Sequence, residues 1–277
     1  MTLLRPATVE EAVKLFGANP AAVPLAGGTD FMVAWNAGDA NGRTVLDLSR
    51  LSPWKRIRPF DRGVSIGALV THWDLQQHAV IRRRFPLLVG ACATVGGRQI
   101  QARGTLGGNV ANASPAGDTF PPLSVYEARV RLRSMKGTRV LAIQEFFTGV
   151  KKTARSEGEL IDSIQMEFPR RPSRQMFRKV GTRAASAISK VVASGLLWLA
   201  SDGRIRELRF ALGSVAPTVR RLASVESFVV GKRPTPAVIR TAVELLDRDI
   251  SPIDDLRSTR DYRLEVSRNL LRSFLAG

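Results

Sequence analysis

Apolar residues at helical spacing alternate with short apolar runs through the first hundred residues, and this pattern predicts helices interleaved with strands. Thr8 and Glu11 form a capping box ahead of the first helical stretch. The elements predicted after it are strands at 22–26, 45–48 and 64–70 and helices at 31–35, 71–83 and 87–94. The N-terminal part of the chain is therefore expected to mix helices with short strands.

Strict alternation of apolar and polar residues becomes more frequent in the second half of the chain. Residues 129–133 alternate and meet residues 140–143 across a glycine turn, which predicts a β-hairpin. The remaining predicted elements are a strand at 164–168, a hairpin of 190–199 with 205–212, and helices at 236–247 and 259–274. Residues 170–174 are rich in arginine and proline and mark the best linker. We therefore expect one domain over 1–170 and a smaller α+β domain over 171–277.

The charge of the chain brings nucleic acid into consideration. Forty-two basic and 24 acidic residues give a net charge of +18, and 34 of the basic residues are arginine. A surplus of this size attracts anions or acidic partner proteins. The arginines are scattered, however, and no helix-turn-helix, zinc finger or aromatic-rich RNA-binding strand can be read from the sequence. We expect no nucleic-acid partner, and a basic nucleic-acid- or anion-binding module without a cofactor is the alternative from a different class.

Several other classes are excluded by composition. The longest apolar stretches, such as 191–200, are well short of the ~20 residues that a membrane-spanning helix needs. The N-terminus lacks the pattern of a secretory signal, so a cytoplasmic location is the default expectation, with export beside a signal-bearing partner as the alternative. Cys92 is the one cysteine, which permits no internal disulfide and no iron–sulfur cluster. His72 and His78 do not make a metal site, so we expect no metal on this chain.

A glycine turn at Pro24–Asp30 connects a predicted buried strand to a predicted helix start. Unpaired backbone N–H groups at such a point attract an anion, and glycine lets a phosphate approach the backbone closely. The turn is neither GxGxxG nor GxxxxGK(S/T), so a purely structural glycine turn is the alternative. Asp30 would cap one amide of the helix and leave the others free.

The run from Gly96 to Gly117 is too rich in glycine, asparagine and serine for a regular helix, so we expect an ordered loop. A segment with so little apolar area is not stabilised by burial, and a ligand would order it. Its hydroxyl and amide side chains, together with the N–H groups of Gly107 and Gly108, suit a pyrophosphate-bearing cofactor. Asp118 would accept hydrogen bonds from ribose hydroxyls.

Taken together, Pro24–Asp30 and Gly104–Asp118 resemble the motifs of the FAD-binding, medium subunit of the molybdenum hydroxylases, the xanthine dehydrogenase, CO dehydrogenase and aldehyde oxidoreductase family. Residues 179–190, 211–217 and 251–263 are similar to the C-terminal flavoprotein domain of the same family. The resemblance therefore covers nearly the whole chain, with several motifs in the same order.

The resemblance implies an α+β fold. A two-lobed FAD-binding domain of the vanillyl-alcohol-oxidase/PCMH type, with subdomains at about 1–57 and 58–170, would be followed by a smaller C-terminal domain of antiparallel sheet and helices at 171–277. It also implies an oxidoreductase subunit whose FAD takes electrons from the 2Fe–2S clusters of a small subunit and passes them to an external acceptor. Molybdopterin would sit on a large subunit that oxidises the substrate, in a heterotrimer or a dimer of heterotrimers. A free-standing flavin oxidoreductase is the alternative among enzymes.

The cofactor positions of the family carry over to this chain residue by residue. Main-chain N–H groups of the first turn would hold the pyrophosphate, and the second segment would line the flavin and its ribityl chain. These two sets are Leu25, Ala26, Gly27, Gly28, Thr29 and Asp30, and Thr105, Gly107, Gly108 and Asn109. Ser114 and Asp118 would anchor a phosphate and the adenosine ribose. Ile161 and Lys179 are weaker matches, with packing and surface charge as their respective alternatives, and no catalytic residue is required on this chain.

The chain departs from the family at three places. Val95 stands where some members place an aromatic residue near the flavin ring, and Gln101 and Ala102 replace an arginine–asparagine pair. Ser186 and Ala187 stand where NAD-dependent xanthine dehydrogenases have acidic residues. The first two departures argue against stacking of an aromatic side chain on the flavin ring at that position. The third argues against NAD as the electron acceptor.

Overall fold

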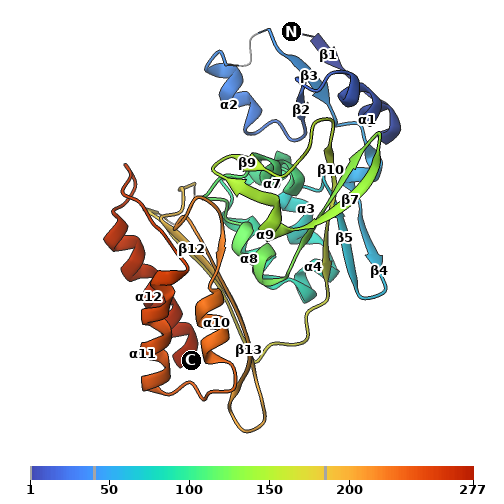
Figure 1. The fold of residues 1–277 in the computed structure, drawn as a ribbon. Helices are drawn as coiled ribbons and strands as arrows, with labels where there is room; N and C mark the ends of the chain where they lie inside the picture. Colours follow the sequence, from blue (N-terminus) through green and yellow to red (C-terminus); the bar gives the residue numbers. More distant parts are fainter. Residues whose placement is uncertain (1, 40–41, 184–185) are drawn as a thin grey trace.

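A three-stranded parallel sheet and two helices form the first part of the fold. The computed structural model describes residues 2–39, 42–183 and 186–277 of the chain. The elements of the first part are β1 (Thr2–Leu4), α1 (Val9–Ala18), β2 (Val23–Leu25), α2 (Phe31–Asn36) and β3 (Thr44–Asp47). Strand β3 lies between β1 and β2. Phe16 of α1 and Leu46 of β3 are buried in a shared small core, at the opposite end of the molecule from the C-terminal helices (Figure 1).

The second sheet is antiparallel and forms the centre of the N-terminal domain. Its strands lie in the order β4–β5–β10–β6–β7, so the last strand of the domain is inserted between two hairpins. The strands are β4 (Ile57–Phe60), β5 (Gly63–Gly67), β6 (Arg129–Ser134), β7 (Gly137–Ala142) and β10 (Leu160–Glu167). The short elements η1 (Ser52–Lys55), β8 (Phe147–Gly149) and β9 (Lys152–Thr153) complete the strand-rich part.

Short helices cover one face of this second sheet (Figure 1). They are α3 (His72–Gln77), α4 (Ala79–Arg84), α5 (Pro86–Thr94), α6 (Arg98–Arg103), α7 (Leu106–Asn112), α8 (Phe120–Val125) and α9 (Ile143–Phe146). Ile66, Val130 and Ile164 of the sheet are fully buried in one cluster with Leu88 and Leu106 of the helices. This packing removes a large apolar area from water and fixes the helices against the sheet.

The C-terminal domain is a second antiparallel sheet backed by helices. Its elements are β11 (Arg174–Val180), β12 (Val191–Leu199), β13 (Ile205–Gly213), β14 (Arg220–Arg221), α10 (Ala223–Val229), α11 (Pro236–Leu245), η2 (Leu246–Arg248) and α12 (Arg260–Ala276). A Cβ on Gly195 of β12 would lie 2.7 Å from the ring of Phe274 in α12. The glycine therefore allows α12 to pack directly on the sheet.

Helix α8 joins the two domains, because it packs against β12 and β13 of the C-terminal sheet. Side chains alternate along a strand, so each strand contributes to both faces. Leu196 and Ala211 belong to the core of the N-terminal domain, whereas Leu197 and Phe210 belong to the core of the C-terminal domain. The central strands of the second domain are thus buried on both faces.

Most predicted elements are present. Thr8 caps α1 by accepting the N–H of Glu11 at 3.1 Å. The two predicted hairpins form, β6 with β7 and β12 with β13, and the helices expected at 236–247 and 259–274 correspond to α11 with η2 and to α12. The overall α+β class, with an FAD-type N-terminal domain and a smaller antiparallel C-terminal domain, is confirmed. No helix in the part of the chain that the structure describes is long and apolar enough to span a membrane.

Three local predictions were wrong. The run at 96–117 is not a continuous loop, because it contains α6 and α7. Thr105 starts α7 by accepting the N–H of Gly108 at 3.0 Å, and Leu106 and Val110 on the inner face of this helix are buried. The helix expected over 71–83 is broken at His78, whose backbone is extended, into α3 and α4. Strand β5 stops at Gly67 rather than reaching residue 70.

Candidate functional site

Two adjoining cavities run along the side of the molecule where the glycine turns lie. The turn cavity has a volume of about 680 Å³ and is lined by residues 23–31, Thr105, Gly108 and Arg155, among others. The interdomain cavity has a volume of about 950 Å³ and lies between residues 95–118 of the N-terminal domain and residues 179–264 of the C-terminal domain. Both volumes fall within the ~300–1,000 Å³ of typical ligand sites. Residues common to both linings are Val95, Asn109 and Asn112, so the two cavities adjoin.

The first glycine turn presents a row of backbone donors to the turn cavity. Within the described residues, the N–H groups of residues 26–31 donate to no protein acceptor. Gly28 has φ of +79°, which turns the chain from β2 into α2. All six residues line the turn cavity, and successive backbone N–H groups without a protein acceptor are typical of anion-binding turns.

The same turn is held against the second segment by close packing. A Cβ on Gly27 would lie 1.8 Å from the carbonyl oxygen of Arg103, and a Cβ on Gly104 would lie 3.4 Å from Oγ1 of Thr29. The two turns therefore contact each other directly, and the turn cavity stays open beside the contact. Glycine is required at position 27 because no side chain fits between the turns.

The second segment does not offer the backbone donors that the sequence suggested. The N–H of Gly107 donates to the carbonyl of Ala68 at 3.1 Å, and the N–H of Gly108 donates to Oγ1 of Thr105 at 3.0 Å. Both donors are used inside the fold, so the expectation that they face a ligand was wrong. Asn109 lines both cavities, and its Oδ1 accepts from Oγ1 of Thr119 at 2.5 Å.

Asp30 does not cap α2, contrary to the prediction. Its backbone is helical rather than extended, and its side chain makes no cap hydrogen bond. Instead Oδ1 of Asp30 accepts a hydrogen bond from Nδ2 of Asn112 at 3.2 Å. This bond connects the first turn to α7, and both residues line the turn cavity.

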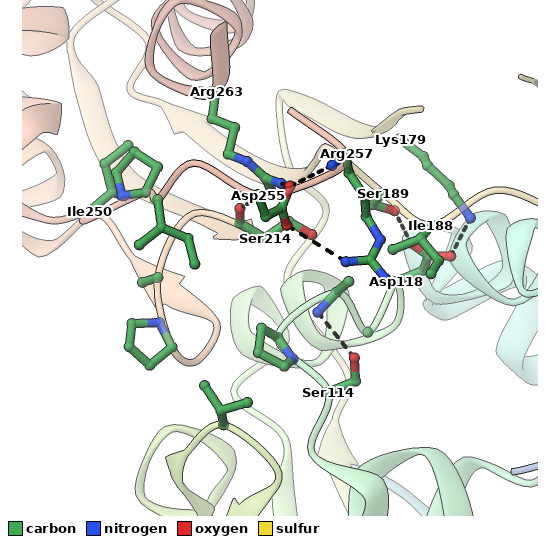
Figure 2. A pocket seen from close by; sticks show the side chains of 18 of the residues that line it. Ser114, Asp118, Lys179, Ile188, Ser189, Ser214, Ile250, Asp255, Arg257 and Arg263 are labelled. Carbon is green, nitrogen blue, oxygen red and sulfur yellow. Dashed lines mark hydrogen bonds and ion pairs between the residues drawn. The ribbon is translucent and has the colours of Figure 1, made fainter. Parts of the chain in front are cut away.

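A buried polar cluster joins the two domains at the interdomain cavity. Nζ of Lys179 donates to Oδ2 of Asp118 at 2.6 Å and to the carbonyl of Thr94 at 2.9 Å. The hydroxyl of Ser189 donates to the other oxygen of Asp118 (Figure 2). Burial raises the pKa of the Asp118 carboxyl, while the hydrogen bonds from Lys179 and Ser189 act in the opposite direction. Asp118 thus orients Lys179 in the cavity wall, and two of the three Nζ protons are already used.

The structure brings twelve of the fourteen predicted cofactor residues to the cavity walls. Those along the turn cavity are Leu25, Ala26, Gly27, Gly28, Thr29, Asp30, Thr105, Gly108 and Asn109. Ser114, Asp118 and Lys179 line the interdomain cavity. Gly107 and Ile161 line neither of the two. Ile161 packs in the core of the N-terminal domain, and a Cβ on Gly107 would lie 2.5 Å from the carbonyl oxygen of Ala68.

Arg155 is a cavity residue that sequence reasoning missed. The residue lines the turn cavity and is half-buried, and burial lowers the pKa of its guanidinium. Its hydrogen bonds are long, 3.3 Å from Nη1 to the carbonyl of Glu159 and 3.4 Å from Nε to Oγ1 of Thr153. The carboxylate of Glu159 is already taken by Arg139 at 2.6 and 2.8 Å. Arg155 is therefore a poorly compensated cation beside the free N–H groups.

His72 is a second missed residue of the turn cavity. Its side chain is 2% exposed, and Nδ1 has no hydrogen-bond partner within the described chain. Burial lowers the pKa of His72 to about 4, so the imidazole is neutral at physiological pH. Nothing in the sequence indicated this place in a cavity wall, because helical periodicity does not report what a neighbouring loop covers.

Comparison with known proteins agrees with this arrangement. Residues 1–170 match the FAD binding domain in molybdopterin dehydrogenase, and residues 176–277 match the CO dehydrogenase flavoprotein C-terminal domain. The glyceraldehyde dehydrogenase medium chain of Sulfolobus acidocaldarius is 29% identical over 96% of this chain and 94% of the relative. The xanthine dehydrogenase FAD-binding subunit of Escherichia coli O157:H7 is 27% identical over 98% and 94%.

A solved structure extends the agreement to the fold. A chain of the carbon monoxide dehydrogenase from Hydrogenophaga pseudoflava superimposes with a TM-score of 0.93 at 26% identity, and the match covers all of this chain and 96% of that one. The sequence match and the fold match both span both domains. The chain belongs to the family of FAD-binding medium subunits of the molybdopterin dehydrogenases.

Proposed function

We propose that this chain is the FAD-carrying electron-transfer subunit of a heteromeric molybdenum hydroxylase. The observation that carries the proposal is the row of free N–H groups at residues 26–31 along the turn cavity. Such a row suits a pyrophosphate, because each oxygen can accept several of these donors. The adjoining interdomain cavity offers space for the rest of a dinucleotide next to it.

The residues present fit FAD at both ends of the site. Arg155 adds a cation to the backbone donors that would face the pyrophosphate. Asn109 lies along both cavities and would contact the linking part of the molecule, and Ser114 and Lys179 would contact the part in the interdomain cavity. Asp118, which already accepts from Lys179 and Ser189, would act chiefly by holding Lys179 in place.

The work of this chain would be to bind, orient and tune the cofactor. Bound FAD supplies the redox chemistry, the uptake and release of electrons. Lys179 would stabilise negative charge near its position through a fixed, partly buried ammonium group. Val95 lines both cavities, and its apolar side chain would exclude water from the place where they adjoin.

Partner subunits complete the proposal. The 2Fe–2S clusters and the molybdopterin would be carried by a small and a large subunit, in a heterotrimer or a dimer of heterotrimers. The charge of +18 would attract acidic surfaces on these partners. The cytoplasm is the proposed compartment, with export beside a signal-bearing partner as the alternative. Co-purification at low and high salt tests the charge argument, since association that does not respond to salt contradicts it.

The domain boundaries are part of the same proposal. We divide the chain at residue 170 and place subdomains at about 1–57 and 58–170. The division between sheets supports this, because the parallel sheet ends at Asp47, the second sheet at Glu167 and the third begins at Arg174. Limited proteolysis followed by mass spectrometry would report cleavage near 170 if the linker is exposed.

An absorption spectrum of the purified chain tests the main proposal. We expect flavin bands with one FAD for each chain, and tighter binding of FAD than of riboflavin, which lacks the pyrophosphate. A colourless chain that takes up no FAD would contradict the proposal. Substrate turnover by the isolated chain would favour a free-standing oxidoreductase instead, because an electron-transfer subunit needs its partners.

A further inference from the structure

Two rows of residues cross the middle of the outer face of the second sheet, which is the face opposite to the covering helices (Figure 1). Each row consists of residues that lie directly opposite one another on the neighbouring strands β4, β5, β10 and β6, and each row begins and ends with arginine. The first row is Arg58, Ser65, Gln165 and Arg129, and the second is Arg56, Gly67, Ser163 and Arg131. We call these two rows the arginine face.

The row between these two points inward. It packs in the core of the N-terminal domain, and its members are Ile57, Ile66, Ile164 and Val130. Because side chains alternate along a strand, the two rows of the arginine face point away from that core. Arg56, Arg58 and Arg129 are exposed, and the side chain of Arg131 is 42% exposed. The sheet therefore presents two columns of arginines, one along β4 and one along β6, about 14 Å apart across three strand spacings.

The arginines of the arginine face are largely unpaired. Among residues 2–39, 42–183 and 186–277, Arg56, Arg58 and Arg129 form no ion pair, and their guanidinium groups donate no hydrogen bond. Nε of Arg131 lies 3.8 Å from Oδ2 of Asp162, which is too long for a hydrogen bond. Like charges held on one sheet repel each other, so an anion placed over them is favoured.

Acidic residues lie around the arginine face and not within its rows. At the end nearest α1, Arg133 pairs with Glu10 at 2.9 Å and approaches Asp162 at 4.0 Å. At the opposite end, Glu167 lies across from Gly63. The other acids of the bordering segments are Asp61 in the β4–β5 turn, Glu127 before β6, which pairs with Arg209, and Glu145 after β7. The bordering cations are Lys55, Arg62 and Lys136, and Arg139 of β7 is paired with Glu159. The uncompensated charge is therefore concentrated in the middle, with carboxylates at both ends.

Neutral polar groups and exposed apolar side chains accompany the arginines. Ser65 and Gln165 lie between the two columns and are half-buried, and their side chains form no hydrogen bond within the described part of the chain. Phe60, at the β4–β5 turn, is 41% exposed, and Val140, across from Arg131 on β7, is 45% exposed. Arginine and aromatic side chains are enriched in protein–protein interfaces. The outer face of the sheet therefore has the composition of a protein-binding surface.

We propose that the arginine face binds a compact acidic patch on a partner protein. Carboxylates of that patch lie over both columns, because a guanidinium donates two parallel hydrogen bonds to a carboxylate. Ser65 and Gln165 bond to polar groups between these carboxylates. The inference goes beyond the proposed function: no residue of the arginine face lines the turn cavity or the interdomain cavity, so the contact does not depend on bound FAD.

The arrangement of charges favours a protein over nucleic acid. A nucleic-acid strand that followed one column would carry its phosphates past both ends of the arginine face, where Asp162 and Glu167 repel them. A strand that crossed the columns would pass the neutral strip between them, about 14 Å wide, where no cation meets its phosphates. An acidic patch of limited size avoids both penalties, because the carboxylates at the ends then face neutral or basic parts of the partner.

The test measures binding of an acidic peptide to the full chain by fluorescence anisotropy at low salt. The probe is a fluorescein-labelled peptide with four successive glutamates between uncharged glycine–serine flanks. The variant is Arg58→Gln/Arg129→Gln, which removes one guanidinium from each column. Neither guanidinium bonds to the described part of the chain, so the fold should be retained, and circular dichroism checks this. We expect the dissociation constant of the peptide to rise roughly tenfold, because two exposed ion pairs are lost.

The control is Arg206→Gln/Arg233→Gln, which makes the same change in net charge on exposed residues of the C-terminal domain. It should change the dissociation constant of the peptide less than about twofold, because salt screens charges that do not touch the peptide. Equal weakening by both double variants means a general attraction between the chain and the peptide, and it overturns the inference. So does peptide binding that neither variant weakens, and so does a wild-type chain that does not bind the peptide.

A labelled oligothymidylate identifies the class of partner. We expect both double variants to weaken its binding equally, because the whole surplus of positive charge attracts it. A loss of oligothymidylate binding in Arg58→Gln/Arg129→Gln that is at least as large as the loss of peptide binding assigns the surface to nucleic acid and overturns the inference. These outcomes leave the proposed function standing, because the flavin spectrum tests that function separately.

Discussion

The carbonyl oxygen of Arg103 lies 1.8 Å from the position that a Cβ on Gly27 would occupy. The end of α6 therefore packs on the bare backbone of the first glycine turn, and this contact brings two segments that are far apart in sequence to one cavity. The hydrogen bond from Nδ2 of Asn112 to Oδ1 of Asp30 holds the same turn at its other end. Glycine at position 27 has a structural role that is inseparable from the binding role proposed for its neighbours.

Replacing Gly27 with alanine should destabilise the turn and reduce FAD binding together. The new Cβ would meet backbone atoms that cannot rotate away, and overpacking of this kind costs about 1–3 kcal/mol. We expect a lower free energy of unfolding in urea and loss of the flavin bands after gel filtration. The control is Gly17→Ala in α1, where the nearest atom to the new Cβ is 3.5 Å away and alanine should stabilise the helix by up to about 1 kcal/mol. Full FAD binding by Gly27→Ala would show that the contact is not needed.

Gly107→Ala separates packing from ligand binding. Its Cβ would lie 2.5 Å from the carbonyl oxygen of Ala68, so the free energy of unfolding should fall by about 1–3 kcal/mol. The Gly107 N–H is already bonded to Ala68 and the residue lines neither cavity, so the FAD affinity of the folded fraction should change little. Fluorescence titration of flavin below the unfolding temperature measures that affinity. A large loss of affinity in a fully folded sample would restore a direct role for this glycine.

Local signals in the sequence explain which elements could be predicted. The cap at Thr8 and the hairpin of β12 with β13 depend on residues close together in the chain, so the local pattern was sufficient to predict both. Helix α7 was missed because its stability comes from contacts distant in the sequence: Leu106 is fully buried in the core of the N-terminal domain, and Ala68 lies so close that only glycine fits at position 107. Strand β11 was not predicted because its residues are half-exposed and carry arginine and lysine, which resemble a linker.

The candidate site was predictable to a similar extent. Both glycine turns were recognised because glycine and small polar residues have few other uses at such density. Arg155 was missed, since one arginine among 34 carries no signal until the fold brings the loop before β10 to the first turn. The engagement of the Gly107 and Gly108 N–H groups was equally invisible, because their partners are set by the start of α7 and by Ala68.

Arg155→Gln should weaken FAD binding roughly tenfold, which corresponds to about 1.4 kcal/mol, as expected for one charge-assisted hydrogen bond to phosphate at a half-buried site. Riboflavin binding should be unaffected, because riboflavin has no phosphate. Isothermal titration of both ligands at two salt concentrations measures the difference. The control is Arg233→Gln, an exposed arginine outside the turn and interdomain cavities. If FAD and riboflavin lose affinity equally, Arg155 acts on loop structure and not on the phosphates.

His72 should make stability depend on pH below neutrality. Because burial lowers its pKa in the folded state from 6.5 to about 4, the unfolded chain binds a proton between these values that the folded chain does not. The free energy of unfolding should therefore increase with pH across this window, by about 3 kcal/mol in total, and the contribution should be complete above pH 6.5. His72→Gln should remove this increase of the unfolding free energy in urea titrations from pH 4.5 to 7.5. The control His78→Gln keeps His72 and should show the same increase as the wild-type chain. An identical slope in the wild-type chain and in His72→Gln would mean that the buried imidazole is not the source of the pH dependence.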